Sequence, residues 1–210
     1  MLHSPADHSG KPKDRQLIAV VIVLFLATAP ARATAATPTE QVEATVRSVL
    51  RILREQPAWE AQELKQAIGR RFDFEEMAKR SLGRHWRKLT AEQRQRFVTL
   101  FTNLLKNTYI DEIKAYNNEK VIFTSERRDG AYAVVQSQIV PRNSQPISVD
   151  YKLHMAGDEW KVYDVVVENV SLVNNYRSQF NRVLFNGTFE ELIDRMKAVE
   201  QSESRNKEAA

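Results

Sequence analysis

Two carboxylates and two tyrosines late in the chain are of the residue types that acid–base chemistry uses. Asp164 and Glu168 lie four residues apart in an extended stretch, and paired carboxylates can act as general acid and base. Four residues of a strand, however, span about 13 Å, which is long for a cooperating pair. The alternative is that each carboxylate meets a basic side chain or a backbone donor near a strand end. Tyr151, Tyr163 and Asp164 could also form an acid–base set in a cup-shaped isomerase or hydrolase, which the sequence permits but does not indicate.

Histidine is the other residue type that could bind a metal or act as a base. His85 and His154 are the two histidines that follow residue 36. His154 falls on the polar face of its predicted strand, so we predict a surface side chain there. The sequence has no Cys, no Gly-rich phosphate loop and neither a G-x-S-x-G nor an H-E-x-x-H motif. These patterns give no positive support to catalysis or to a metal site.

A basic segment runs from Arg70 to Arg96. It holds nine basic residues and four acidic ones, Asp73, Glu75, Glu76 and Glu92. An ordinary solvated helical face would explain it. The functional alternative is a surface that meets anionic lipid headgroups or an acidic docking partner. The candidates for such contact are Arg80, Arg84 and Arg87.

The sequence predicts that these residues lie in a fold of helices followed along the chain by strands and then by further helices. Capping boxes at Thr37–Glu40 and Thr90–Gln93 each open a helix with an apolar stripe. The period then changes to two, and short turns join consecutive segments, which predicts an antiparallel meander. The predicted strands are Val121–Ser125, Ala131–Val140, Ile147–Met155 and Glu159–Val170. The fold class is therefore α+β, with a curved four-stranded antiparallel sheet packed with several helices.

The last predicted strand is apolar on both faces. Alternation places Trp160, Val162, Val166 and Val170 on one side and Tyr163, Val165 and Val167 on the other. An antiparallel sheet usually exposes one face to water. The pattern leaves open whether the second side touches more protein or something that the protein carries.

Residues 1–36 have the layout of a signal peptide. A polar stretch with Lys11, Lys13 and Arg15 precedes the apolar run Leu17–Ala29, and small residues follow. The run is short for a membrane span, although an uncleaved anchor is the alternative. We expect cleavage after Ala33 or Ala36, a folded domain over residues 37–197 and a disordered tail over 198–210.

Charge gives little support to a nucleic-acid partner. The net charge of +4 includes four basic and two acidic residues within positions 1–36. Removing that excess of two leaves about +2 on the remaining chain, a weak bias that predicts no nucleic-acid binding.

Two long segments resemble the signatures of the MlaC family, also called the toluene-tolerance family. They are FDFEEMAKRSLGRHWRKLTAEQRQRF (Phe72–Phe97) and WKVYDVVVENVSLVNNYRSQF (Trp160–Phe180), and PISVDYKL (Pro146–Leu153) also fits. The resemblance spans roughly Val42 to Met196. One position departs from the family pattern, because Asn169 stands where Gly is usual; Asn is the best substitute if that position needs a positive φ.

The resemblance implies a periplasmic phospholipid carrier with no catalytic residues, no metal and no cofactor, the bound phospholipid being cargo. It implies transfer between an outer-membrane lipoprotein complex and the substrate-binding subunit of an inner-membrane ABC transporter, which maintains outer-membrane lipid asymmetry. An enzyme in the same cup and an envelope scaffold remain the alternatives.

On this reading, apolar side chains of the sheet and helices line a cavity for the acyl chains. An apolar stripe is also what an ordinary core produces, so alternation alone does not choose. The predicted lining residues are Met77, Leu100, Leu104, Val134, Val149, Tyr151, Leu153, Val162 and Val166.

Overall fold

The structure, a computed structural model, describes residues 36–55, 61–114, 119–142 and 144–208. The expected signal peptide lies outside these residues as far as position 35. Within the described ranges, every helix is either too short or too polar to cross a membrane.

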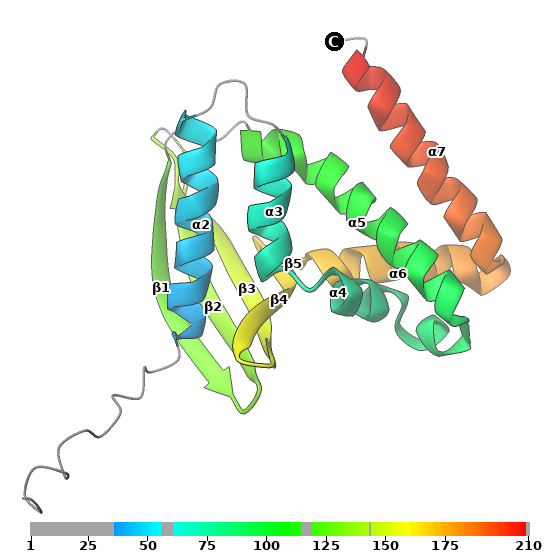
Figure 1. Ribbon diagram of the computed structural model, residues 1–210, viewed down its shortest axis with the longest axis horizontal. Helices are drawn as coiled ribbons and strands as arrows, with labels where there is room; N and C mark the ends of the chain where they lie inside the picture. The colour runs from blue at the N-terminus through cyan, green and yellow to red at the C-terminus, as the bar shows by residue number, and fades with distance from the viewer. Residues whose placement is uncertain (1–35, 56–60, 115–118, 143, 209–210) are drawn as a thin grey trace, which may run out of the picture. The chain divides into compact units, whose positions relative to one another are not determined.

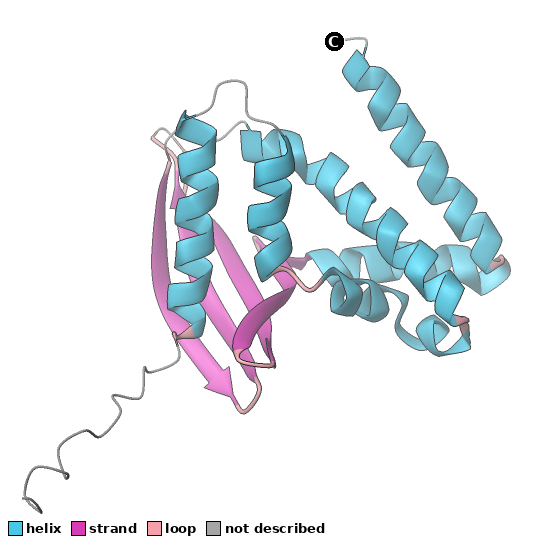
Figure 2. Ribbon diagram, viewed as in Figure 1, coloured by secondary structure: helices cyan, strands magenta, loops and turns pink. Residues whose placement is uncertain are grey.

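Helices flank the sheet in the chain, as predicted (Figures 1 and 2). Before the sheet come α2 (Pro38–Glu55), α3 (Ala61–Arg71), α4 (Phe74–Leu82), the 3-10 helix η1 (Gly83–Lys88) and α5 (Ala91–Lys114). After it come α6 (Leu172–Asn186) and α7 (Phe189–Glu208).

The predicted helix ends are confirmed by their hydrogen bonds. At α2, the Glu40 amide donates to Thr37 Oγ1 (3.1 Å), and the Thr37 amide donates to Glu40 Oε2 (2.7 Å). Thr90 and Gln93 form the same reciprocal pair at the start of α5, at 3.2 and 3.0 Å. These bonds satisfy amides that a helix cannot pair internally. Gly83 ends α4 with a φ of 54°, which glycine adopts without a Cβ penalty.

Helix α7 extends into the segment that is predicted to be a disordered tail. The segment predicted as a disordered tail from residue 198 is helical as far as Glu208. Leu192, Ile193 and Met196 are buried and anchor the first half of the helix. The residues beyond are mostly strong helix formers such as Gln, Glu, Arg and Lys, so the helix continues without an apolar stripe.

The sheet is antiparallel throughout, in the order β1-β2-β3-β4-β5. Its strands are β1 (Lys120–Asp129), β2 (Tyr132–Val140), β3 (Ile147–Ala156), β4 (Glu159–Val167) and β5 (Val170–Ser171). The α+β class is confirmed, with five strands in place of four. The predicted last strand is divided because Glu168 and Asn169 have φ values of 48° and 65°, which turn the chain back on itself.

A β-bulge at Tyr163 corrects the predicted faces of β4. Val162 pairs with Leu153, and Asp164 pairs with Lys152, so Tyr163 is the extra residue between them. The bulge reverses the alternation beyond it. Val165 and Val167 therefore share a face with Trp160 and Val162, whereas Val166 lies on the other.

Buried apolar residues form two clusters. The sheet core joins Val42 of α2 to Ala133, Val135, Leu153, Trp160 and Val162. The helical core lies among α4, η1, α5, α6 and α7, and Phe97, Phe101, Tyr176 and Phe180 are its aromatic centre, with ring centroids 5.2–5.7 Å apart. Phe72 packs against both clusters and therefore connects them.

Candidate functional site

The face of the sheet that packs against α2 is called the inner face here, and the opposite one the outer face. Cross-strand partners point to the same side, and the register joins Val135, Tyr151 and Val165 in one row of the inner face. The next row joins Ala133, Leu153 and Val162. Val135, Leu153 and Val162 are fully buried beneath α2, so this end of the inner face belongs to the core.

Further along, the inner face is incompletely covered. Phe123, Tyr151 and Val165 are only partly buried, and Ile147 and Val167 are 37% and 43% exposed. These five residues are called the apolar strip below. They extend across β1, β3 and β4, and Val149 in the same region is buried. A large apolar surface that the fold leaves open on a sheet is characteristic of a binding surface.

The apolar strip contains one ionisable group, the Tyr151 phenol. Burial raises its pKa, and a hydrogen bond with Ser137 opposes this effect. Ser137 itself donates to the Val149 carbonyl at 3.0 Å. The phenol therefore stays neutral at physiological pH, and the strip presents an uncharged surface to whatever contacts it.

The predicted sheet residues divide between the two faces. Val149, Tyr151, Leu153 and Val162 lie together on the inner face. Val134 pairs with Lys152, and Val166 pairs with Asp150, so both valines lie on the outer face. The sequence did not show what the second side of β4 contacts. In the structure this outer side contacts protein, because Cζ of Arg80 in α4 lies 4.0 Å from the centroid of the Tyr163 ring.

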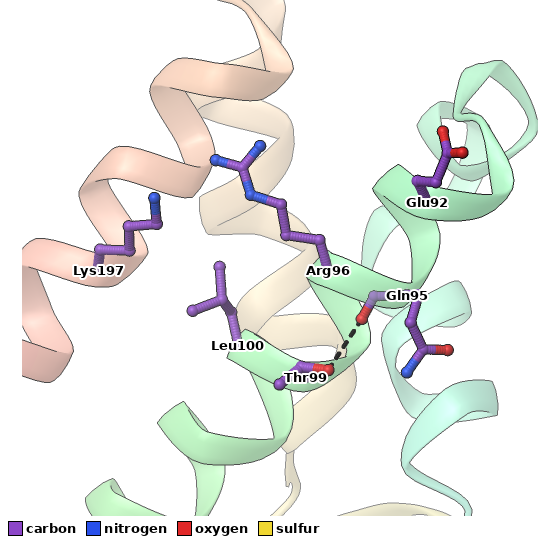
Figure 3. Close-up of a pocket in the computed structure, with 6 residues that line it drawn as sticks. All are labelled: Glu92, Gln95, Arg96, Thr99, Leu100 and Lys197. Carbon is purple, nitrogen blue, oxygen red and sulfur yellow. Dashed lines mark hydrogen bonds between the residues drawn. The ribbon is translucent and has the colours of Figure 1, made fainter.

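The predicted helical residues do not reach the apolar strip. Met77 and Leu104 are buried in the helical core. Leu100 lies in a groove of about 500 Å³ between α5 and α7, beside Arg96 and Lys197, as Figure 3 shows. Arg96 is paired there with Glu190 of α7 at 2.7 Å.

The three predicted surface arginines also differ. Arg80 donates to Glu76 at 2.9 Å and lies over Tyr163, so it is engaged within the fold. Arg84 and Arg87 are exposed on η1. These two remain available to a partner or a headgroup.

Asp164, one of the two carboxylates considered for acid–base chemistry, has a structural role in joining β4 to α6. Buried Asp164 accepts hydrogen bonds from Lys152 Nζ (3.1 Å), from Ser171 Oγ (2.7 Å) and from the Val173 amide (3.1 Å). It thereby fastens the start of α6 to β4. Tyr151 lies on the opposite face of the sheet, so the suggested set with Asp164 is not assembled.

His154 has a structural partner too, although its strand position predicts a surface residue. Its Nε2 donates to Asp73 Oδ2 at 2.9 Å, and only 21% of the side chain is exposed. The other oxygen, Asp73 Oδ1, accepts the Glu76 amide at 2.9 Å and caps α4. The polar outer face is thus partly covered by α4. The described residues also contain no group of three or more His, Asp or Glu side chains placed to hold a metal ion.

Sequence reasoning missed Phe123 and Ile147 as members of the apolar strip. Ile147 keeps the alternation of β3, whereas β1 has a bulge between Phe123 and Ser125. The partial exposure of both residues depends on which helices cover the sheet, and the strand pattern does not contain that information. The sequence shows that Val165 and Val167 are apolar, but the bulge at Tyr163 determines which face of the sheet they lie on.

Known proteins provide independent comparisons. The family model "MlaC protein" matches residues 39–198. The toluene tolerance protein ttg2D of Pseudomonas putida is 34% identical over 95 residues, 45% of this chain and 44% of that protein. The intermembrane phospholipid transport system binding protein MlaC of Haemophilus influenzae is 28% identical over 120 residues, 55% of this chain and 56% of that protein. The chain thus spans about half the length of these relatives.

A solved structure is similar over most of the chain. The phospholipid-binding protein from Ralstonia solanacearum, in complex with a phospholipid, superimposes with a TM-score of 0.74 at 25% identity. The match covers 80% of this chain and 99% of that one. Together with the family match over residues 39–198, it establishes that this chain belongs to the MlaC family.

Proposed function

We propose that this protein is a phospholipid carrier. The acyl chains of the bound phospholipid would lie against the inner face of the sheet. The observation that carries the proposal is the apolar strip, an uncharged apolar surface that the fold leaves partly open. The phospholipid complex of the structural relative from Ralstonia solanacearum supports it.

The tail-binding wall would consist of the apolar strip together with its buried neighbours on the inner face. Those neighbours are Val149, Leu153 and Val162. Two acyl chains carry about 30 methylenes, and hiding each from water is worth roughly 0.8 kcal/mol. A phospholipid therefore does not cross water freely, and a carrier must cover most of the apolar surface of its acyl chains. An apolar wall recognises volume and not headgroup chemistry, so low headgroup specificity is expected.

The route of transport is a finer part of the same proposal. The chain would be exported to the periplasm by the signal peptide over residues 1–36. It would exchange lipid with an outer-membrane lipoprotein complex and with the substrate-binding subunit of an inner-membrane ABC transporter, and so maintain outer-membrane lipid asymmetry. Support comes from family membership and from the transport-system name of the Haemophilus influenzae relative. Arg84 and Arg87 are the candidate docking cations.

Native mass spectrometry of protein purified without added lipid tests the carrier function directly. We expect a mass increment that corresponds to one or more phospholipids, identified after solvent extraction. Protein that is folded and carries only its apo mass, and that also fails to take up lipid from vesicles, would exclude the proposal.

Adjacent valines of β4 give a matched pair of variants for the tail wall. Val165 points to the inner face and Val166 to the outer, and both are partly buried. A carboxylate at position 165 would have to be buried against acyl chains without a partner, which is strongly unfavourable. Val165→Asp should therefore lose bound lipid, and Val166→Asp should retain it. Circular dichroism ensures that only folded variants are compared; equal lipid content in the two would exclude the inner face as the wall.

A further inference from the structure

A second hollow lies on the helical part of the molecule, between η1 and α6. Its volume is about 330 Å³, and Leu82 contributes apolar surface to it. The other lining residues are polar or basic: Arg84, His85, Arg177, Ser178 and Asn181. No residue of this lining is acidic.

Gly83 makes room for one of the two arginines. A Cβ at this position would lie 2.8 Å from both Nε and Nη2 of Arg177, so the guanidinium rests directly on the glycine backbone. The φ of 54° at Gly83 also favours glycine. The Arg177 guanidinium is therefore held near the end of α4, beside Arg84.

The polar neighbours provide further donors. Asn181 lies one helical turn after Arg177 and so on the same side of α6. Its Oδ1 accepts from His85 Nε2 at 3.0 Å, which leaves the two N–H groups of the amide free to donate. Ser178 donates its hydroxyl to the Asn174 carbonyl at 3.0 Å, so it is not counted as a donor to a ligand.

Neither arginine of this hollow is neutralised by the residues that the structure describes. Arg80 pairs with Glu76, and Arg96 pairs with Glu190. Among the ion pairs found over the described ranges, by contrast, none joins Arg84 or Arg177 to a carboxylate. Two neighbouring guanidinium groups without a counter-charge create a local positive potential, and their planar donor forks match a tetrahedral oxyanion.

We propose that Arg84, Arg177 and Asn181 bind a phosphate group, either as the free anion or as part of a lipid headgroup. The hollow consists of side chains from α4, η1 and α6, whereas the apolar strip lies on the sheet. The proposal therefore does not depend on the carrier function, and a carrier of any cargo would possess this site.

An NMR titration of the full chain with inorganic phosphate, at constant ionic strength, tests the site. Saturable shifts of the backbone amides of Arg84, His85 and Arg177 are expected. Arg84→Gln and Arg177→Gln should each weaken binding about tenfold or more, because hydrogen bonds to charged groups are the stronger ones. Arg177→Lys should restore only part of the affinity, because an ammonium lacks the fork.

Arg182→Gln is the matched control, since Arg182 is an exposed arginine of α6 that does not line the hollow. It should leave phosphate binding unchanged. Arg84 is exposed, so Arg84→Gln tests the site even if Arg177→Gln does not fold. Shifts that do not saturate, or that Arg84→Gln and Arg182→Gln alter equally, would overturn the proposal.

Vesicle flotation distinguishes the two sources of the phosphate group. Vesicles of phosphatidylcholine, with and without phosphatidylglycerol, are compared for the unaltered chain and for Arg84→Gln. Binding to the anionic vesicles that Arg84→Gln weakens supports a headgroup, and saturable phosphate shifts without vesicle binding support the free anion. Vesicle binding without phosphate shifts would exclude a phosphate site.

Discussion

Removing the Asp164 carboxylate should loosen the junction between β4 and α6. The side chain is 5% exposed and accepts three hydrogen bonds, from Lys152, Ser171 and the Val173 amide. Ser171 in turn accepts the Asn174 amide at 3.1 Å as the N-cap of α6. The carboxylate therefore supports the first turn of α6 both directly and through its cap.

The size of the effect follows from what each substitution leaves unpaired. Asp164→Ala leaves the buried Val173 amide without its acceptor and Lys152 without its counter-charge. Breaking a buried ion pair costs about 3–5 kcal/mol, and the lower end applies because 33% of the Lys152 side chain is exposed. We expect Asp164→Ala to lower the free energy of unfolding by about 3 kcal/mol. Asp164→Asn keeps an acceptor oxygen and should cost about 1–2 kcal/mol.

Urea unfolding followed by tryptophan fluorescence measures both values. Asp150→Ala is the control, because Asp150 lies on the same outer face and accepts one exposed hydrogen bond, from Gln136 at 3.2 Å. A substitution of that kind should change stability by less than about 0.5 kcal/mol. If Asp164→Ala costs no more than Asp150→Ala, the assigned role of Asp164 is refuted. Asp164→Asn should keep its bound lipid; loss of an enzymatic turnover with lipid binding intact would support the enzyme alternative.

Three further outcomes follow from the described geometry. Asn169→Val should cost about 1–2 kcal/mol because φ is 65° there, whereas Asn169→Gly should be close to neutral; equal urea midpoints would contradict this. Ser171→Ala should cost about 1 kcal/mol or more through loss of the α6 cap, and a variant as stable as the unaltered chain would contradict the assignment. The folded-state pKa of Tyr151 is raised, so the unfolded chain loses the phenol proton first and stability should fall as pH rises above about 10. Tyr151→Phe should remove that part of the pH dependence in urea unfolding, and an unchanged profile would contradict it.

Local features of the fold could be predicted from the sequence. The Thr37–Glu40 and Thr90–Gln93 boxes need only residues three positions apart, so the sequence contains all the information about them. The order of helices and strands follows from hydrophobic period in the same way. Asn169 stands where the family pattern usually has Gly, and its φ of 65° shows that this position does adopt a positive φ.

Features that depend on contacts between distant segments could not be predicted. One bulge at Tyr163 moved Val166 to the outer face, and alternation contains no sign of such an insertion. The polar face of its strand predicts a surface position for His154. The sequence pattern does not reveal that Asp73, 81 positions earlier, covers this side chain. The exposure of the apolar strip likewise depends on which helices pack over the inner face, and these come from distant parts of the chain.

The division into two cores has a consequence for the order of folding. The sheet core is built largely from neighbouring hairpins, whose partners are close along the chain. The helical core instead joins Phe97 and Phe101 of α5 to Tyr176 and Phe180 of α6, with the whole sheet between them in sequence. Closing so long a loop is slow unless the intervening chain is already compact. We therefore expect the meander to form first, and its folding to bring α6 back to α5.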